Sequence, residues 1–197
     1  MKKPKLNRKE KITKEIDLPE SVNASVNGWF LLIKGPKGEI NRYFKQHTVS
    51  IKINNKKILL ESERMTKKDK KIIGSLSAHI KNMIRGSQQN HTYTLKICSG
   101  HFPMNVSVSG NKFVVKNFLG EKLPRTLSLK EGVNVKVEGE LINITSANKE
   151  MAGQVSGDIE QLTRRPGYDN RIFQDGIYII NKDGKEMTKR FCSWDWF

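Results

Sequence analysis

The sequence predicts an α+β protein made of two tandem repeats, each a small antiparallel sheet packed against one helix. Three observations support this class. A segment recurs within the chain, apolar and polar residues alternate after each copy, and each copy ends with apolar residues at helical spacing. Period-2 alternation is typical of strands with one buried face, and strands that precede a single helix favour antiparallel sheets covered by that helix.

The repeat emerges when the chain is compared with itself. Val22–Glu39 aligns with Met104–Glu121 at an offset of 82 residues, and the alternation that begins at Val49 resumes at Val133, at an offset of 84. The identical pairs include Asn23 and Asn105, Val26 and Val108, Gly28 and Gly110, Lys34 and Lys116, Gly38 and Gly120, and Glu39 and Glu121. Chance can supply the alternation but hardly all these matches in one register. We therefore predict a tandem duplication.

The first copy is expected to contain strands and then one helix. Gly28 and the segment 35–38 are predicted as tight turns, because glycine permits positive φ and proline presets φ. Thr66 and Asp69 form a capping-box pattern that opens a helix, which Gly86 is expected to end. The predicted strands are 22–27, 29–34, 39–44, 49–53 and 57–62.

The second copy repeats this plan. Its helix is expected from about Asn148 to Thr163, with apolar residues on one face that we interpret as core rather than as a cofactor site. The predicted strands are 92–98, 104–109, 112–117, 121–127, 133–138 and 140–145.

Four regions follow from this reading. Residues 1–15 form a basic N-terminal extension that is too polar to fold alone. Residues 16–88 and 89–183 form the first and second α+β repeats, and the second ends in an arginine-rich loop that is considered below as a binding site. Residues 184–197 form a C-terminal tail with four aromatic residues, for which fold-back, docking on a partner and disorder all stay open.

The net charge of +16 favours a polyanionic partner, because cations that neutralise phosphates release bound counterions. The charge is uneven. Residues 1–90 hold 21 basic and 8 acidic side chains, whereas residues 91–197 hold 15 and 12. The second half is therefore expected to bind RNA through a local cluster rather than a general field. The sequence contains no basic amphipathic helix of the kind that binds a membrane surface. No apolar run is long enough to span a membrane.

The sequence shows no pattern for an enzyme, a cofactor or a metal. There is no P-loop, no paired-carboxylate motif and no metal-ligand spacing among the four histidines and two cysteines. Cys98 and Cys192 are far apart, which is typical of free thiols in a reducing cytoplasm, although the two can still pair. No small-molecule substrate is expected.

The segment after the second helix carries the strongest candidate site. Three arginines, Arg164, Arg165 and Arg171, lie near Tyr168 in a loop that Pro166 and Gly167 bend. Guanidinium groups bind phosphates in a bidentate manner and tyrosine offers a stacking face for bases. An ordinary solvated loop is the alternative. The Gly-x-x-Gly match at 35–38 joins two strands, which favours a hairpin turn over the backbone clamp of KH modules. The 67–71 lysine run is either a solvated helix face or a phosphate contact.

Several long motifs in one order resemble the universal L-six family of large-subunit ribosomal proteins, called L-nine in eukaryotic naming. The resemblance covers roughly residues 16–182 and rests on the duplicated unit, IKGPKG at 33–38, SGHFPMNV at 99–106, NFLGEK at 117–122 and RIFQDGIYI at 171–179. The forms of two of these motifs, HFP and NFLGEK, are similar to those of the eukaryotic and archaeal branch of the family.

The resemblance implies a structural protein that binds rRNA of the large subunit near the sarcin-ricin loop and the stalk base, beside neighbouring ribosomal proteins in the cytoplasm. It implies that the second domain makes the main contacts. The expected RNA-binding residues are Arg164, Arg165, Tyr168, Arg171, Asp175, Gly176, Lys116 and Lys122. A non-ribosomal tandem RNA-binding protein, such as a translation regulator, is the alternative function.

Overall fold

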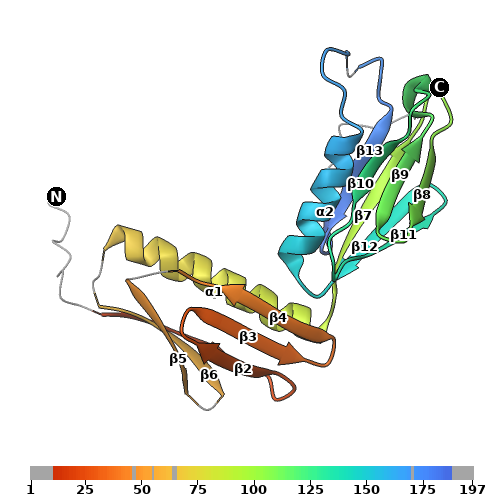
Figure 1. Cartoon of the computed structure of the whole chain (residues 1–197). Helices are drawn as coiled ribbons and strands as arrows, with labels where there is room; N and C mark the ends of the chain where they lie inside the picture. The colour runs from red at the N-terminus through yellow and green to blue at the C-terminus, as the bar shows by residue number, and fades with distance from the viewer. Residues whose placement is uncertain (1–10, 46–47, 55, 64–65, 170, 188–197) are drawn as a thin grey trace, which may run out of the picture. The chain divides into compact units, whose positions relative to one another are not determined.

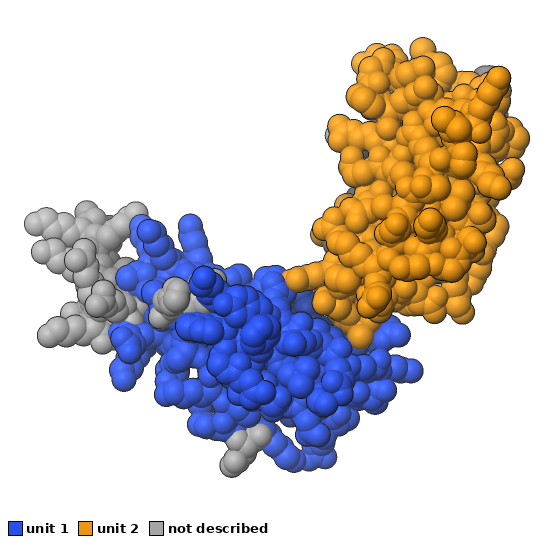
Figure 2. All heavy atoms as spheres, in the orientation of Figure 1, with its two compact units in different colours: residues 1–90 blue, residues 91–197 orange. Residues whose placement is uncertain are grey.

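The computed structural model describes residues 11–45, 48–54, 56–63, 66–169 and 171–187. The chain forms two compact units, residues 1–90 and residues 91–197, which Figure 2 colours separately. Within the described residues, each unit holds two antiparallel sheets and one α-helix (Figure 1). The predicted α+β class with two repeats is confirmed, with two sheets rather than one in each repeat.

The first unit places two three-stranded sheets against α1 (Lys67–Gln88). One sheet has the order β1-β6-β5 and the other the order β2-β3-β4. The strands are β1 (Ile12–Asp17), β2 (Asn23–Asn27), β3 (Phe30–Gly35), β4 (Gly38–Tyr43), β5 (Val49–Asn54) and β6 (Lys57–Ser62). Ile33, Ile58, Leu60 and Ile80 are 0% exposed, so the core lies where the strands meet the apolar face of α1.

The second unit has a five-stranded sheet of order β11-β12-β7-β13-β14, a three-stranded sheet of order β10-β9-β8, and α2 (Lys149–Leu162). The strands are β7 (His91–Cys98), β8 (Asn105–Ser109), β9 (Lys112–Lys116), β10 (Arg125–Ser128), β11 (Asn134–Glu138), β12 (Leu141–Ser146), β13 (Gly176–Lys182) and β14 (Lys185–Glu186). α2 packs against β7, β12 and β13. Leu95, Phe113, Ile142 and Ile159 are 0% exposed at the centre of this unit.

The duplication is visible in the pairing of the equivalent hairpins. Asn23 pairs with Lys34 across β2 and β3, and Asn105 pairs with Lys116 across β8 and β9. The turns between these strands each use a left-handed glycine, with φ of 62° at Gly28 and 58° at Gly110. These residues are matched pairs of the sequence alignment, so the repeat in the sequence is a repeat in the structure.

Helix α1 begins as predicted and ends later than predicted. Thr66 Oγ1 accepts a hydrogen bond from the Asp69 amide at 3.2 Å, which caps the first turn. Gly86 does not stop the helix, which continues to Gln88. The reason is packing: Gly86 and Ser87 are buried, and the Lys37 amide in the β3–β4 turn donates to the Ser87 carbonyl at 3.0 Å.

Three predicted boundaries need correction. β1 begins at Ile12, inside the segment 1–15 that was expected to be an extension, because β1 pairs with β6 and buries Ile16. β10 begins at Arg125 rather than at residue 121, because Asn117 and Leu119 adopt left-handed φ values of 58° and 49° around a 3₁₀ turn over Phe118–Gly120.

The third correction concerns the start of the expected tail 184–197, where β13 and β14 form a hairpin. The aromatic residues of that tail and the cations before Lys11 lie outside the described residues. Cys98 is buried at the end of β7 and is disulfide-bonded, which corrects the expectation of free thiols. Cys192, the other cysteine of the sequence, also lies outside the described residues.

Candidate nucleic-acid interface

The candidate site is the loop between α2 and β13, which the protein fixes at both ends (Figure 1). At the first end, Thr163 is buried, and its hydroxyl accepts a hydrogen bond from the Ile177 amide at 2.9 Å and donates to the Glu160 carbonyl at 3.2 Å. One side chain therefore joins the end of α2 to the start of β13. The loop begins and ends at nearly the same place in the core.

Asp175 anchors the other end of the loop. Its carboxylate accepts hydrogen bonds from the Gly100 amide at 2.6 Å and the His101 amide at 3.0 Å, and the His101 Nδ1 atom lies 2.5 Å from it. Burial alone would raise the pKa of this carboxyl group, but the hydrogen bonds from His101 and Gly100 outweigh burial and lower the pKa of Asp175. Asp175 thus stays ionised and ties the loop to the segment after β7.

A chain of ring contacts links the anchor to the predicted binding residues. The His101 and Phe173 rings stack at 4.9 Å, and Phe173 meets Tyr168 edge-on at 5.0 Å. The Arg165 guanidinium lies over the Tyr168 ring at 4.8 Å. Contacts of this kind hold flat groups in fixed orientations. Arg165 and Tyr168 are therefore presented by a supported surface rather than by a free loop.

Glu121 and Arg125 support the loop from the three-stranded sheet. The Arg125 guanidinium donates two hydrogen bonds to the Glu121 carboxylate, at 2.8 and 2.7 Å, and a third to the Leu162 carbonyl at 2.6 Å. These hydrogen bonds from Arg125 lower the pKa of Glu121. Glu121 also lies 3.6 Å from the Arg165 guanidinium. The segment between β9 and β10 therefore joins the end of α2 and the loop.

The outer part of the loop is shaped by its own backbone. The Asp169 side chain accepts a hydrogen bond from the Arg171 amide at 2.9 Å, and the Asp169 carbonyl accepts from the Phe173 amide at 2.9 Å. Gly176 has φ of 156°, and a Cβ at this position would lie 3.2 Å from the Tyr178 hydroxyl. A side chain here would be tight against Tyr178 and would strain the backbone, so the geometry of the loop exit favours glycine.

The predicted site residues fall into two groups. Arg164, Arg171, Tyr168, Lys116 and Lys122 are exposed, and Arg165 is partly exposed. Within the described part of the chain, no hydrogen bond or ion pair engages the Arg164 or Arg171 guanidinium, so both are available to a phosphate. Asp175 and Gly176 are buried, and their place is in the support of the loop rather than on its surface.

Sequence reasoning assigned no role to His101, Phe173, Glu121 and Arg125, which hold the loop. The motifs at 99–106 and 117–122 contain His101 and Glu121, and their place in these motifs was the available signal. Nothing in the sequence places residues 74 positions apart, such as His101 and Asp175, in contact.

A pocket of about 540 Å³ lies against the loop in the second unit. Its lining includes Gln161 of α2, Arg164, Arg165, Tyr168 and Phe173. Flat side chains, guanidinium groups and an amide therefore converge on one hollow.

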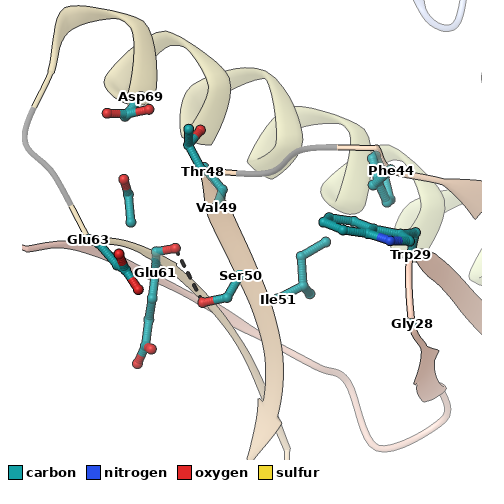
Figure 3. Close-up of a pocket in the computed structure, with 11 residues that line it drawn as sticks. Gly28, Trp29, Phe44, Thr48, Val49, Ser50, Ile51, Glu61, Glu63 and Asp69 are labelled. Atoms are coloured by element: carbon teal, nitrogen blue, oxygen red, sulfur yellow. Dashed lines mark hydrogen bonds between the residues drawn. The ribbon is translucent and has the colours of Figure 1, made fainter.

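A second pocket of about 540 Å³ lies in the first unit, beside β5, β6 and the start of α1. Figure 3 shows Trp29 and Phe44 close together at one end and Glu63 and Asp69 at the other. Its charged described lining residues are Glu61, Glu63 and Asp69, without lysine or arginine. Carboxylates repel a phosphate backbone, so the loop of the second unit is the better candidate for RNA.

Among the described residues, no group of three or more histidine, cysteine, aspartate or glutamate side chains could hold a metal ion. The same residues include no helix with the length and apolar character to cross a membrane.

Comparison with known proteins gives a family match in each unit. Residues 18–90 and 102–176 match the family described as Ribosomal protein L6. The large ribosomal subunit protein uL6 of Methanococcus vannielii is 42% identical over 176 residues, which are 89% of this chain and 97% of that protein. The uL6 proteins of Methanothrix thermoacetophila and Methanobrevibacter smithii are 40% and 42% identical, and cover 88% and 87% of this chain. The matches take in 98% and 97% of those two proteins.

Proposed function

The chain belongs to the ribosomal protein L6 family, and we propose that it is a structural constituent of the large ribosomal subunit on the cytoplasmic ribosome. The three archaeal relatives confirm the resemblance to this family and to its archaeal branch. The family consists of ribosomal proteins and not of enzymes. The partners proposed are large-subunit rRNA and the ribosomal proteins beside it. The proposed location is near the sarcin-ricin loop and the stalk base, as the resemblance implies.

The observation that carries the rRNA-binding part of the proposal is the anchored loop 163–175. Arg164 and Arg171 are exposed, and the loop that presents them is tied to the core by Thr163 and Asp175. Because the two ends of the loop are already held, less entropy is lost in ordering the loop backbone when these guanidinium groups bind phosphates. Lys116 ends β9 and Lys122 follows Glu121, which lies beside Arg165, and both lysines are exposed for further phosphate contacts.

The test is the salt dependence of binding to a large-subunit rRNA fragment. The double variant Arg164→Ala/Arg171→Ala should reduce the slope of log K against log[salt] by up to about two, because each phosphate contact contributes roughly 0.7–0.9. The matched control removes two exposed lysines at the opposite end of β9 and β10, Lys112→Ala/Lys130→Ala, and should keep the slope near that of the unchanged protein. Equal slopes in the two variants would refute the role of the loop.

Cosedimentation separates the ribosomal role from that of a translation regulator. The chain should remain with large subunits through a sucrose gradient at salt concentrations that remove loosely bound proteins. Hydroxyl-radical footprinting on the same particles tests the location, since protection away from the sarcin-ricin loop and stalk base would contradict it.

A further inference from the structure

The pocket in the second unit has the size and the lining of a ligand site. Its volume of about 540 Å³ falls within the roughly 300–1,000 Å³ typical of pockets for small molecules. Tyr168 is 43% exposed although it contacts both Phe173 and Arg165. A flat surface of ring and guanidinium therefore remains open to an incoming group.

The polar lining decides which part of an RNA chain fits inside. Glu160 and Asp175 contribute to the lining, and both are unfavourable neighbours for a phosphate. Gln161 contributes an amide, which offers both a donor and an acceptor. Arg164 is exposed to solvent, where a phosphate is accessible. The hollow as a whole thus suits an uncharged flat group with hydrogen-bonding edges, while the exposed Arg164 guanidinium suits an anion.

Resting on the proposed function, we propose that this pocket receives one unpaired nucleobase that is extruded from the rRNA. The base lies against Tyr168 and Arg165, its edge faces Gln161, and the phosphate of the same nucleotide meets Arg164 at the rim. Proteins recognise single-stranded RNA in this way, by stacking unpaired bases on aromatic rings or guanidinium planes and by bonding their edges. An intact duplex leaves the pocket empty, because its bases are paired and stacked.

The pocket is present in the chain without RNA, and contacts among and beside its lining residues support its walls. Phe173 is held between His101 and Tyr168, and Glu121 lies beside Arg165. A preformed pocket favours a base that is already unpaired, because opening a paired one requires additional free energy.

Chemical probing of the rRNA fragment in complex with the full chain tests this proposal. Dimethyl sulfate for adenine and cytosine, and a carbodiimide for uracil and guanine, should show one unpaired base that the protein protects. In Tyr168→Leu, which replaces the ring with a shorter apolar side chain, that base should regain reactivity while the hydroxyl-radical footprint on the backbone persists. Affinity should fall about tenfold, within the ~1–3 kcal/mol that stacking of one base contributes. Tyr168→Phe keeps the ring and should retain both protection and affinity.

The outcomes separate this proposal from the function on which it rests. If the unchanged chain binds the fragment but protects no unpaired base, or if Tyr168→Leu protects the same base, the pocket holds no nucleobase and the rRNA-binding role stands. If the unchanged chain does not bind the fragment at all, the proposed function fails first. Circular dichroism of both variants establishes that they are folded. Should Tyr168→Leu fail to fold, Gln161→Leu replaces it and should expose the same base.

Discussion

Replacement of Gly35 by alanine tests how the first unit is packed. A Cβ at Gly35 would lie 2.6 Å from the Ser87 carbonyl oxygen and 2.7 Å from the Ser87 Cβ. The φ of Gly35 is not in the left-handed region, so alanine meets no backbone strain there and the effect is steric. Because Ser87 is buried, with 0% exposure, it has no space into which it can move freely.

The magnitude combines three contributions. Overpacking of a filled site costs roughly 1–3 kcal/mol. Displacement of the Ser87 carbonyl weakens the hydrogen bond that it accepts from the Lys37 amide at 3.0 Å, which costs about 1 kcal/mol. The reduced entropy of the unfolded chain offsets about 0.4–1 kcal/mol. We expect Gly35→Ala to lower the free energy of unfolding of the first unit by about 2 kcal/mol.

The matched control is Gly74→Ala. Gly74 lies within α1, and a Cβ there would have no atom within 4 Å, so the change should raise stability by about 0.5–1 kcal/mol. The assay is peptide-resolved hydrogen exchange on the full chain. The slowest amides of α1 should exchange about 30-fold faster in Gly35→Ala and severalfold more slowly in Gly74→Ala. Peptides from 91–187 should be unchanged in both. Exchange in Gly35→Ala within twofold of the unchanged protein would refute the steric reasoning.

Two further predictions concern acid stability and proteolysis. The pKa of Asp175 is lowered in the folded protein, so its contribution to stability is present above its ordinary pKa and is lost as the pH falls through the lowered value. Asp175→Asn should therefore reduce the loss of unfolding free energy below about pH 4, measured by urea titration, whereas the exposed control Glu131→Gln should not. Limited proteolysis should cut at the exposed residues 89–90 rather than at Gly86, which is buried in α1, and a first cut within β3 would contradict the two-unit structure.

Sequence reasoning worked best where local signals and the repeat agreed. The hairpin turn at Gly28 was supported by its counterpart at Gly110, and the start of α1 was supported by Thr66 and Asp69. β1 was missed because four of its six residues are polar and exposed, so its only buried side chain is Ile16. Its position depends on pairing with β6, which no local pattern specifies.

The candidate site was predictable in its exposed part only. Arginines and a tyrosine in a bent loop are a local sequence signal for a binding surface. Arg164 and Tyr168 are exposed, as residues that contact a ligand must be. The contacts that hold the loop are not local, since Asp175 meets His101 across β7 and β13. Because long-range contacts depend on sheet topology, they became visible only in the fold. The domain boundaries at 88 and 183 and the RNA contacts themselves stay predictions.

The two equivalent hairpins have diverged in the connection that follows them. Residues 36–37 alone connect β3 to β4, and this turn packs closely against Ser87. From β9 to β10 the chain runs through 117–124, which carries Glu121 to Arg125 and Arg165. The two repeats accommodate connections of different length because each unit is compact and has its own core. A change in the 117–124 connection therefore leaves the packing of the first unit unaltered, because no side chain of that unit takes part in these described contacts.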